Sequence, residues 1–362
     1  MTPVNEHSNR LMNPVARLLA IGAMVCALSA AGQGVRYRDS VFSEISYTMG
    51  VHYSSAPSVK GFEAYLTLDL YEPVDDTAPS RPLVMLMHAG GFMSGAAHDY
   101  TLRSLCFALA RRGYVCASIN YRVGVPDTTS SLDYVKAIYR VVEDARAAAR
   151  YVVAQQDLRI DPERVIVGGN SAGAVAALHY ACMDDSAMAA RIGDTAGIGD
   201  TGTAGPTPGA AAVLNMWGGL LDPSWIQPGG PPIISFHGTA DTVVPFRCGR
   251  ALGVPDLTMC GSGAIDSLAR ARATPTELHT LDTGHVEFPV EYMAPLMADF
   301  LYRFVMGGSG VVARPPLQGS ARLRGPHAVL YMTERALPPG YRTDLRGRST
   351  RAGAPGVGFD IR

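Results

Sequence analysis

One short segment limits the possible folds of this chain more than any other. Residues 165–174 read VIVGGNSAGA, so a β-branched run leads through two glycines to Ser171 and then into a small-residue stretch, Ala172 to Leu178. The run is typical of a buried strand and the stretch of the start of a helix. The sequence therefore predicts a strand, a sharp turn at Ser171 and a helix, with Gly169 and Gly173 where side chains would collide with neighbouring elements.

The surrounding chain, from about residue 60 to 306, alternates short apolar runs with longer helical patterns. The predicted strands are Tyr65 to Tyr71, Leu83 to His88, Val115 to Asn120, Val165 to Gly168, Ala212 to Met216, Ile233 to His237 and Glu277 to Leu281. The predicted helices are Leu102 to Arg111, Leu132 to Gln156 and Glu291 to Val305, besides the one after Ser171. Several runs are apolar on both faces, as buried parallel strands are. We expect an α/β protein with a mostly parallel central sheet and helices on both of its faces.

Composition narrows the function classes. The 362 residues are 47% hydrophobic and 17% charged, which suits one large domain with extensions. The formal net charge of -1 gives no global field for nucleic acid or an anionic membrane surface, so we expect neither as a partner. Neither paired Cys-x-x-Cys motifs nor His/Cys clusters at zinc spacing occur in the sequence, and we expect no metal and no cofactor.

The N-terminus has the order of a secretory signal. Arg10 and Arg17 precede the apolar run Leu18 to Leu28, and the small residues Ser29 to Gly32 follow. We expect cleavage near residues 29–33, a signal peptide over 1–33 and a secreted, periplasmic or cell-surface protein. A membrane anchor is the alternative, although the run is short for spanning a bilayer, so we expect no stable membrane insertion. Lipidation at Cys26 is less favoured after bulky Val25.

Five cysteines remain after this segment. Cys248 and Cys260 flank a short loop that contains glycine and proline, and we predict a disulfide between them. For three of these residues, separate buried thiols are as good an interpretation as disulfide bonding: Cys106, Cys116 and Cys182.

Two further regions interrupt the pattern. Residues 184–210 are rich in Gly, Ala, Thr and Asp without periodicity, and we interpret them as an inserted flap or surface loop. After Met306 the composition shifts to Gly, Pro and Arg, with nine Arg against three acidic residues in 307–362. We therefore expect a catalytic domain over 34–306 and a basic tail over 307–362.

Ser171 needs partners if it is a nucleophile, because a serine hydroxyl becomes reactive only beside an imidazole that a carboxylate orients. Asp241, in the loop after the run 233–237, is the predicted acid, and His285, after the run 277–281, is the predicted base. They follow Ser171 in the order serine, acid, histidine, which accompanies a serine turn of this kind in the fold where it occurs. Competing acids are Asp222, Asp282 and Glu287; competing bases are His237 and His279, which we interpret as structural or core residues.

A glycine-rich segment, His88-Ala89-Gly90-Gly91-Phe92, follows the predicted strand 83–88. Residues that lack a side chain let their backbone N–H groups approach an oxyanion closely, which Gly90 and Gly91 allow. Ala172, the residue after the predicted nucleophile, is expected to supply the other donor of this predicted oxyanion hole. His88 is interpreted as orienting the loop. Ala89 stands where the related pattern has glycine, and its methyl group either narrows the loop or has no effect.

Several motifs together carry a resemblance to a known family. LDLYEP at 68–73, HAGGF at 88–92, NYR at 120–122, DPER at 161–164, GGNSAGA at 168–174 and HGTADTVVP at 237–245 resemble the carboxylesterase, hormone-sensitive-lipase-like and feruloyl or acetyl-xylan esterase branch of the α/β-hydrolases. The similarity covers roughly residues 60–306. It implies an α/β-hydrolase fold and cofactor-free hydrolysis of small or polymer-linked carboxylic esters through an acyl-enzyme.

The tail carries a second resemblance. DLRGR at 344–348 and GVGFDIR at 356–362 are similar to the end of sorting domains recognised by the type IX secretion system, with Gly358 in place of the usual aromatic residue. This implies contact with secretion machinery; a disordered basic tail is the alternative.

Two other functions fit parts of the pattern. HGTADTVVP and the serine turn also suit a prolyl-oligopeptidase-like serine peptidase, although that family carries a propeller-length region upstream. A non-catalytic binding protein on the same fold is the other alternative, and such relatives lose triad residues that this sequence retains. Trp217 and Trp225 either line a substrate pocket or pack in the core, and core packing is the favoured interpretation. The sequence does not discriminate among ester substrates.

Overall fold

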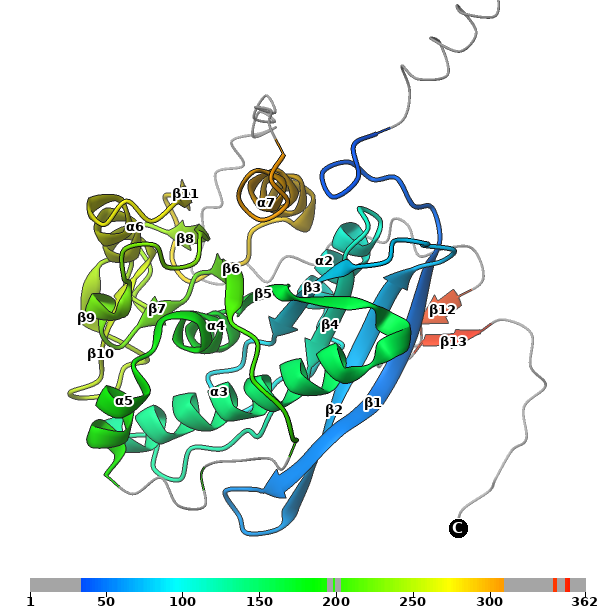
Figure 1. Ribbon diagram of the computed structural model, residues 1–362. Coiled ribbons are helices and arrows are strands. Elements are labelled where there is room, and N and C mark those ends of the chain that lie inside the picture. The colour runs from blue at the N-terminus through cyan, green and yellow to red at the C-terminus, as the bar shows by residue number, and fades with distance from the viewer. Residues whose placement is uncertain (1–33, 194–197, 199–202, 309–340, 344–348, 352–362) are drawn as a thin grey trace, which may run out of the picture. The chain divides into compact units, whose positions relative to one another are not determined.

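The computed structural model describes residues 34–193, 198 and 203–308, together with short strands at 341–343 and 349–351 (Figure 1). The chain divides into two compact units, Met1–Pro315 and Pro316–Arg362. The second is described only as an antiparallel pair, β12 (Tyr341–Thr343) and β13 (Ser349–Arg351). The predicted signal peptide and most of the predicted tail lie outside the described residues.

The first unit is built on one mixed sheet of eight strands in the order β1-β2-β4-β3-β5-β6-β8-β11. These strands are β1 (Ile45–Pro57), β2 (Glu63–Pro73), β3 (Arg81–Met87), β4 (Val115–Ile119), β5 (Ile160–Asn170), β6 (Ala210–Met216), β8 (Ile233–Gly238) and β11 (Thr276–Leu281). Antiparallel pairing is confined to the β1–β2 and β2–β4 ladders, and the six strands from β4 to β11 in this order are parallel. The predicted α/β class with a mostly parallel sheet is confirmed.

Helices cover both faces of this sheet (Figure 1). They are α2 (Tyr100–Ala110), α3 (Ser131–Ala154), α4 (Ala172–Cys182), α5 (Asp185–Ile192), α6 (Ser262–Ala271) and α7 (Val290–Phe304). The apolar residues of α2 and α7 belong to one hydrophobic core, and those of α3, α4, α5 and α6 belong to another. Strand β3 shows how one element serves both cores, because Leu83 and Met85 enter one core whereas Val84 and Leu86 enter the other. Side chains that alternate between two apolar layers produce the continuous apolar runs seen in the sequence.

The structure contains a helix that the sequence did not predict. Residues 184–210, interpreted from the sequence as an inserted flap or surface loop, begin with the helix α5. Asp184 caps this helix by accepting a hydrogen bond from the Ala187 N–H, and Met188 and Ile192 are buried. A helix of eight residues offers only two apolar contacts, too few to produce a visible periodicity. Residues 194–197 and 199–202 lie outside the described part.

The predicted disulfide between Cys248 and Cys260 is confirmed. It joins two strands of a small second sheet, formed by β7 (Gly219–Leu220), β10 (Thr258–Gly261) and β9 (Cys248–Arg250). The other three cysteines among the described residues are free thiols; Cys106 and Cys116 are buried and Cys182 is partly buried.

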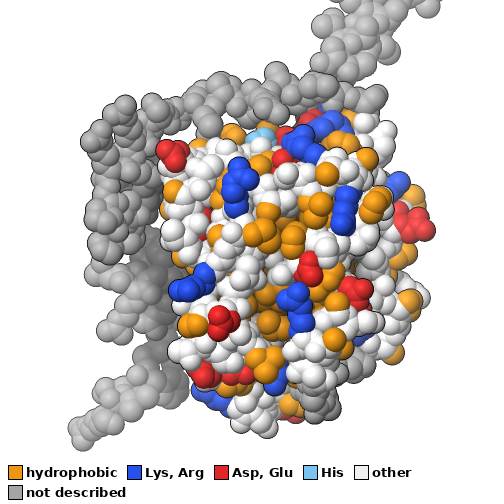
Figure 2. Space-filling view, turned by 90° about the vertical axis from the view of Figure 1, so that its left-hand side faces the viewer, with side chains coloured by type: hydrophobic (Ala, Val, Ile, Leu, Met, Phe, Trp, Pro, Cys, Tyr) orange, Lys and Arg blue, Asp and Glu red, His pale blue; other side chains and the backbone are white. Residues whose placement is uncertain are grey.

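Figure 2 shows one face of the molecule, on which hydrophobic side chains gather near the middle and basic and acidic side chains are interspersed around them. Neither sign of charge dominates this face. No helix among the described residues is long and apolar enough to cross a membrane.

Candidate active site

The backbone turns sharply at Ser171, between β5 and α4. Its φ of 51° and ψ of -117° lie in a region that residues other than glycine rarely adopt. Tight packing encloses the turn: a Cβ on Gly173 would lie 2.0 Å from the Met87 carbonyl oxygen, and a Cβ on Gly169 would lie 2.5 Å from the same oxygen. The predicted strand, turn and helix are therefore present, and the two glycines stand where the sequence required them.

The turn presents the Ser171 hydroxyl to His285. Ser171 Oγ lies 2.8 Å from His285 Nε2, and His285 Nδ1 lies 2.7 Å from Asp241 Oδ2. An ionised carboxylate only accepts hydrogen bonds, so Nδ1 carries the imidazole proton and Nε2 is free to accept the serine proton. Three residues separated by up to 114 positions in sequence thus form one chain of hydrogen bonds.

The loops after two neighbouring parallel strands bring the acid and the base together. Asp241 follows β8 and His285 follows β11, and these strands pair in register from Ile233 with Thr276 onward. Gly238 allows the loops to touch, because a Cβ there would lie 2.2 Å from the Gly284 carbonyl oxygen. Since the carboxyl ends of parallel strands meet at one edge of a sheet, this edge holds the site.

The Asp241 carboxylate is buried and held at both oxygens. Oδ1 accepts hydrogen bonds from the N–H groups of Val243 at 2.8 Å and Val244 at 3.1 Å. Burial alone would raise the pKa of this carboxyl, but hydrogen bonds from His237, His285 and the Val243 N–H outweigh it and hold the pKa well below its usual range. Asp241 therefore stays ionised whenever His285 needs a negative partner.

The glycine-rich loop lies against the first turn of α4. A Cβ on Gly173 would lie 2.7 Å from the His88 carbonyl oxygen. Gly90 has a φ of 119° and approaches Ser94 so closely that only glycine fits, and Gly91 has a φ of 61°. Within the described part of the chain, the N–H groups of Gly90, Gly91 and Ala172 donate to no protein acceptor. Free N–H groups beside a helix N-terminus can stabilise an anion, and their role as an oxyanion hole stays a prediction.

Ala89 fits this loop without strain. Its backbone is outside the left-handed region, where the added methyl group would be costly, and the residue is partly exposed. Its carbonyl oxygen accepts a hydrogen bond from His88 Nδ1 at 2.7 Å. The buried His88 ring stacks on Tyr121, whose hydroxyl donates to the His88 carbonyl oxygen at 2.7 Å. Burial lowers the pKa of His88, so this ring is neutral and shapes the loop.

The competing acids are engaged elsewhere. Asp222 accepts from the Ser224 N–H, Asp282 accepts from the Thr239 hydroxyl, and Glu287 accepts from the Thr101 hydroxyl. Among the competing bases, His279 contacts Glu277 at 2.8 Å. His237 contacts Asp241 itself, with Nε2 3.2 Å from Oδ2. From the sequence, His237 was interpreted as a structural or core residue. Its contact with Asp241 was not predicted, although the two residues are only four positions apart.

Both tryptophans are buried. Trp217 is 2% exposed and stacks on Phe288, and Trp225 is 6% exposed and meets His179 edge to face. Core packing is therefore their role in the described structure.

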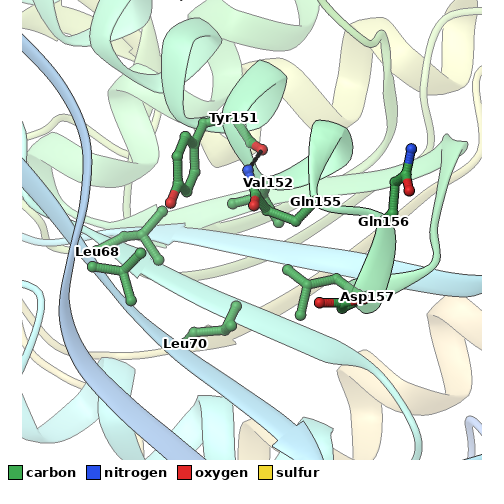
Figure 3. A pocket seen from close by; sticks show the side chains of 9 residues that line it. Leu68, Leu70, Tyr151, Val152, Gln155, Gln156 and Asp157 are labelled. Atoms are coloured by element: carbon green, nitrogen blue, oxygen red, sulfur yellow. Dashed lines mark hydrogen bonds between the residues drawn. The ribbon is translucent and has the colours of Figure 1, made fainter.

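A cavity of about 340 Å³ lies away from these residues, between β2 and the C-terminal end of α3 (Figure 3). Leu68 and Leu70 form part of its apolar lining, and Tyr151, Gln155 and Asp157 are among its polar residues. It contains none of the three residues Ser171, Asp241 and His285.

Comparison with known proteins finds similar sequences among esterases. Residues 68–201 match the model of the BD-FAE family, which groups feruloyl-esterase-like proteins. Esterase-5C of Drosophila miranda and Esterase-5C of Drosophila persimilis are each 29% identical over 137 residues, covering 37% of this chain. The chain spans only 24% of the length of these relatives.

Solved structures show the same fold. Esterase 2 of Thermogutta terrifontis phosphorylated by paraoxon is 22% identical with a TM-score of 0.50, over 73% of this chain and 95% of that protein. The same esterase with butyrate bound is 23% identical with a TM-score of 0.51, over 71% of this chain and 93% of that protein. The eight-stranded sheet and its helices are thus those of the α/β-hydrolase fold.

Proposed function

We propose that this chain, an α/β-hydrolase related to the feruloyl-esterase-like proteins and carboxylesterases, hydrolyses carboxylic esters with Ser171 as its nucleophile. One observation carries the proposal: the hydrogen-bonded chain from Ser171 through His285 to Asp241, presented on a strained turn. Strain of this kind persists only where the surrounding structure enforces it, and it clusters at sites of chemistry.

The geometry supports an acyl-enzyme mechanism. His285 Nε2 takes the proton of Ser171 Oγ while that oxygen attacks the ester carbonyl carbon, and the carbonyl oxygen becomes an oxyanion. The N–H groups of Gly90, Gly91 and Ala172 are the proposed donors to it. His285 then protonates the leaving alcohol, and the acyl group stays on Ser171. Water, deprotonated by the same imidazole, attacks the acyl-enzyme, and the carboxylic acid leaves.

Asp241 supports both halves of the reaction. When His285 gains a proton it becomes positively charged, and the ionised carboxylate 2.7 Å from Nδ1 stabilises that charge. The same contact keeps Nδ1 protonated in the resting state, so that Nε2 faces Ser171 as an acceptor. Because Asp241 is buried, this interaction is weakly screened.

We propose small acyl esters and aryl esters as the first substrates to assay. The structural relative from Thermogutta terrifontis is described with butyrate and with propionate bound, which suits a short acyl group. The matching family model suits an aromatic or polymer-linked ester. The two groups are distinguished by comparing p-nitrophenyl acetate, p-nitrophenyl butyrate and methyl ferulate.

The test of the proposal is the hydrolysis of these esters by purified wild-type protein and by Ser171→Ala. We expect the variant to lose several orders of magnitude in kcat, as removal of a triad residue generally does. Ser224→Ala, at an exposed serine outside the site, is the matched control and should retain wild-type kinetics. Equal hydrolysis by Ser171→Ala and wild type refutes the proposal, and faster cleavage of an aminoacyl anilide than of any ester would indicate a peptidase.

We also propose that the protein is exported. The signal-like N-terminal segment and the disulfide between Cys248 and Cys260 both suit an oxidising compartment. Fractionation of cells that express the full chain tests this, and recovery of uncleaved protein only in the cytoplasm would contradict it.

A further inference from the structure

A second histidine contacts the carboxylate of Asp241. His237 is the last residue but one of strand β8, and its side chain is fully buried. Its Nε2 lies 3.2 Å from Asp241 Oδ2, the same oxygen that receives the hydrogen bond from His285 Nδ1 at 2.7 Å. The mechanism above uses His285 alone, so this contact needs a separate explanation.

The surroundings of His237 determine which ring nitrogen carries the proton. Nε2 lies 3.0 Å from the Val244 carbonyl oxygen as well as beside the Asp241 carboxylate. Both of these groups can only accept, so Nε2 must donate. Nδ1 lies 2.7 Å from the Ser262 hydroxyl, which donates to it when the ring is neutral. The contacts thus place the proton of the neutral His237 ring on Nε2.

A buried polar network extends this assignment across the fold. The Asn215 amide nitrogen donates to the hydroxyl oxygens of Ser262 and Ser235, each at 2.9 Å, and the Asn215 side-chain oxygen accepts from the Gly218 N–H at 2.9 Å. The side chains of Asn215, Ser235, His237 and Ser262 are all completely buried. Strand β6 therefore holds Ser262, the first residue of α6, whose hydroxyl contacts His237 Nδ1.

The result is a carboxylate whose acceptor positions are all occupied. Oδ1 accepts from the N–H groups of Val243 and Val244, Oδ2 accepts from His285 Nδ1, and Oδ2 also lies 3.2 Å from His237 Nε2, whose N–H is shared with the Val244 carbonyl oxygen. A carboxylate with about four acceptor sites and four donors has little freedom to rotate. The titratable groups in contact with Asp241 are His237 and His285, and the network beyond His237 consists of uncharged side chains.

We propose that His237 is a positioning residue, a fixed Nε2–H donor that orients the Asp241 carboxylate toward His285 and shares its negative charge. The inference rests on the proposed function, because it concerns the acid of the same triad. It assigns a purpose to the buried network, which is to keep the neutral His237 ring in one tautomer. His237 acts only through Asp241 and takes no part in proton transfer.

The charge-sharing has a consequence with a definite sign. Removing the Nε2–H donor leaves more negative charge on Oδ2 to stabilise the His285 imidazolium. The His285 imidazolium is then more stable relative to the neutral ring, and the acidic limb of the kcat/KM profile moves to higher pH. A purely structural defect lowers kcat/KM without moving that limb, so the pH profile separates the two explanations.

The test compares His237→Leu, which removes the donor, with His237→Gln, which keeps an N–H near the Nε2 position. For His237→Leu we expect kcat/KM for p-nitrophenyl butyrate to fall about 100-fold, as for a misplaced catalytic group. We expect its acidic limb to rise by about 0.5 to 1 pH unit. The kcat/KM of His237→Gln should be at least tenfold higher than that of His237→Leu. The matched control is His279→Leu, a buried histidine on the neighbouring strand β11, which should leave the limb in place.

An unmoved acidic limb in His237→Leu, whether kcat/KM is unchanged or reduced, would overturn the inference. Nitrogen-15 NMR of histidine side chains in the wild-type protein decides the case where the variants do not fold. We expect the neutral His237 ring to carry its proton on Nε2; a ring protonated on Nδ1 alone refutes the assignment. If wild-type protein hydrolyses no ester, the proposed function fails, and the NMR result still reports on the tautomer.

Discussion

Gly173→Ala tests whether close packing builds the serine turn. The Cβ of the variant would lie 2.0 Å from the Met87 carbonyl oxygen and 2.4 Å from the Met87 carbonyl carbon. Real Cβ atoms essentially never approach within 3.0 Å, so α4 and β3 must separate by about 1.0 Å. Met87 is paired with both neighbouring strands in the middle of the sheet and cannot yield. The shift therefore falls on the first turn of α4, which carries Ser171 and the Ala172 N–H.

The magnitude follows from this displacement. Inserting a methyl group into a packed interior costs about 1 to 3 kcal/mol, and each kcal/mol lowers the Tm of a domain of this size by about 2 to 4 °C. A misplacement of about 1 Å at a reacting group costs about 100-fold in rate. Circular dichroism melts and kcat/KM for p-nitrophenyl acetate measure the two effects. Gly209→Ala is the control, because a Cβ there meets nothing within 4 Å. Unchanged Tm and kcat/KM in Gly173→Ala would refute the reasoning.

Three further predictions address the acid, the pH dependence and the disulfide. Asp241→Asn should fold and lose about 10⁴-fold in kcat, since an amide no longer favours the Nδ1–H tautomer of the base; single-turnover kinetics check this, and a loss below tenfold would contradict it. The hydrogen bond with His279 lowers the pKa of Glu277 to about 2, so its stabilising effect is complete above its ordinary pKa and is lost as the pH falls toward 2. In urea unfolding, Glu277→Gln should therefore be less stable than wild type at pH 6, with the difference shrinking below pH 4; a constant difference would show that the charge is irrelevant. Replacing Cys248 and Cys260 together by serine should lower the free energy of unfolding by about 2 to 3 kcal/mol, and equal melts of variant and wild type would refute it.

Local patterns in the sequence predicted much of the fold. Successive side chains of β3 enter the two cores in turn, so every position is apolar. This gives runs such as Leu83 to Met87, which are typical of buried strands. The turn at Ser171 was predictable because it needs glycines at 169 and 173, and each of them would clash with backbone if it had a side chain. The placement of Asp241 and His285 followed from chain order, since loops after neighbouring parallel strands meet at one edge.

Features that depend on tertiary contacts were not predictable in this way. Strand β1 (Ile45–Pro57) is an edge strand with bulges and many exposed positions, so it lacks a clean alternation. The contact between His237 and Asp241 depends on how the loop after β8 folds back, which spacing alone does not define. The tolerance of Ala89 depends on a backbone conformation that becomes visible only in the structure.

Covalent labelling with a fluorophosphonate measures the central claim most directly, since the probe reacts with a serine that an adjacent imidazole activates. Intact-mass spectrometry of the folded wild-type protein should show a single adduct, and peptide mapping should place it on Ser171. His285→Ala should react far more slowly, because the hydroxyl loses its base. An unlabelled folded protein, or an adduct on any other residue, would contradict the account of Ser171 as the nucleophile.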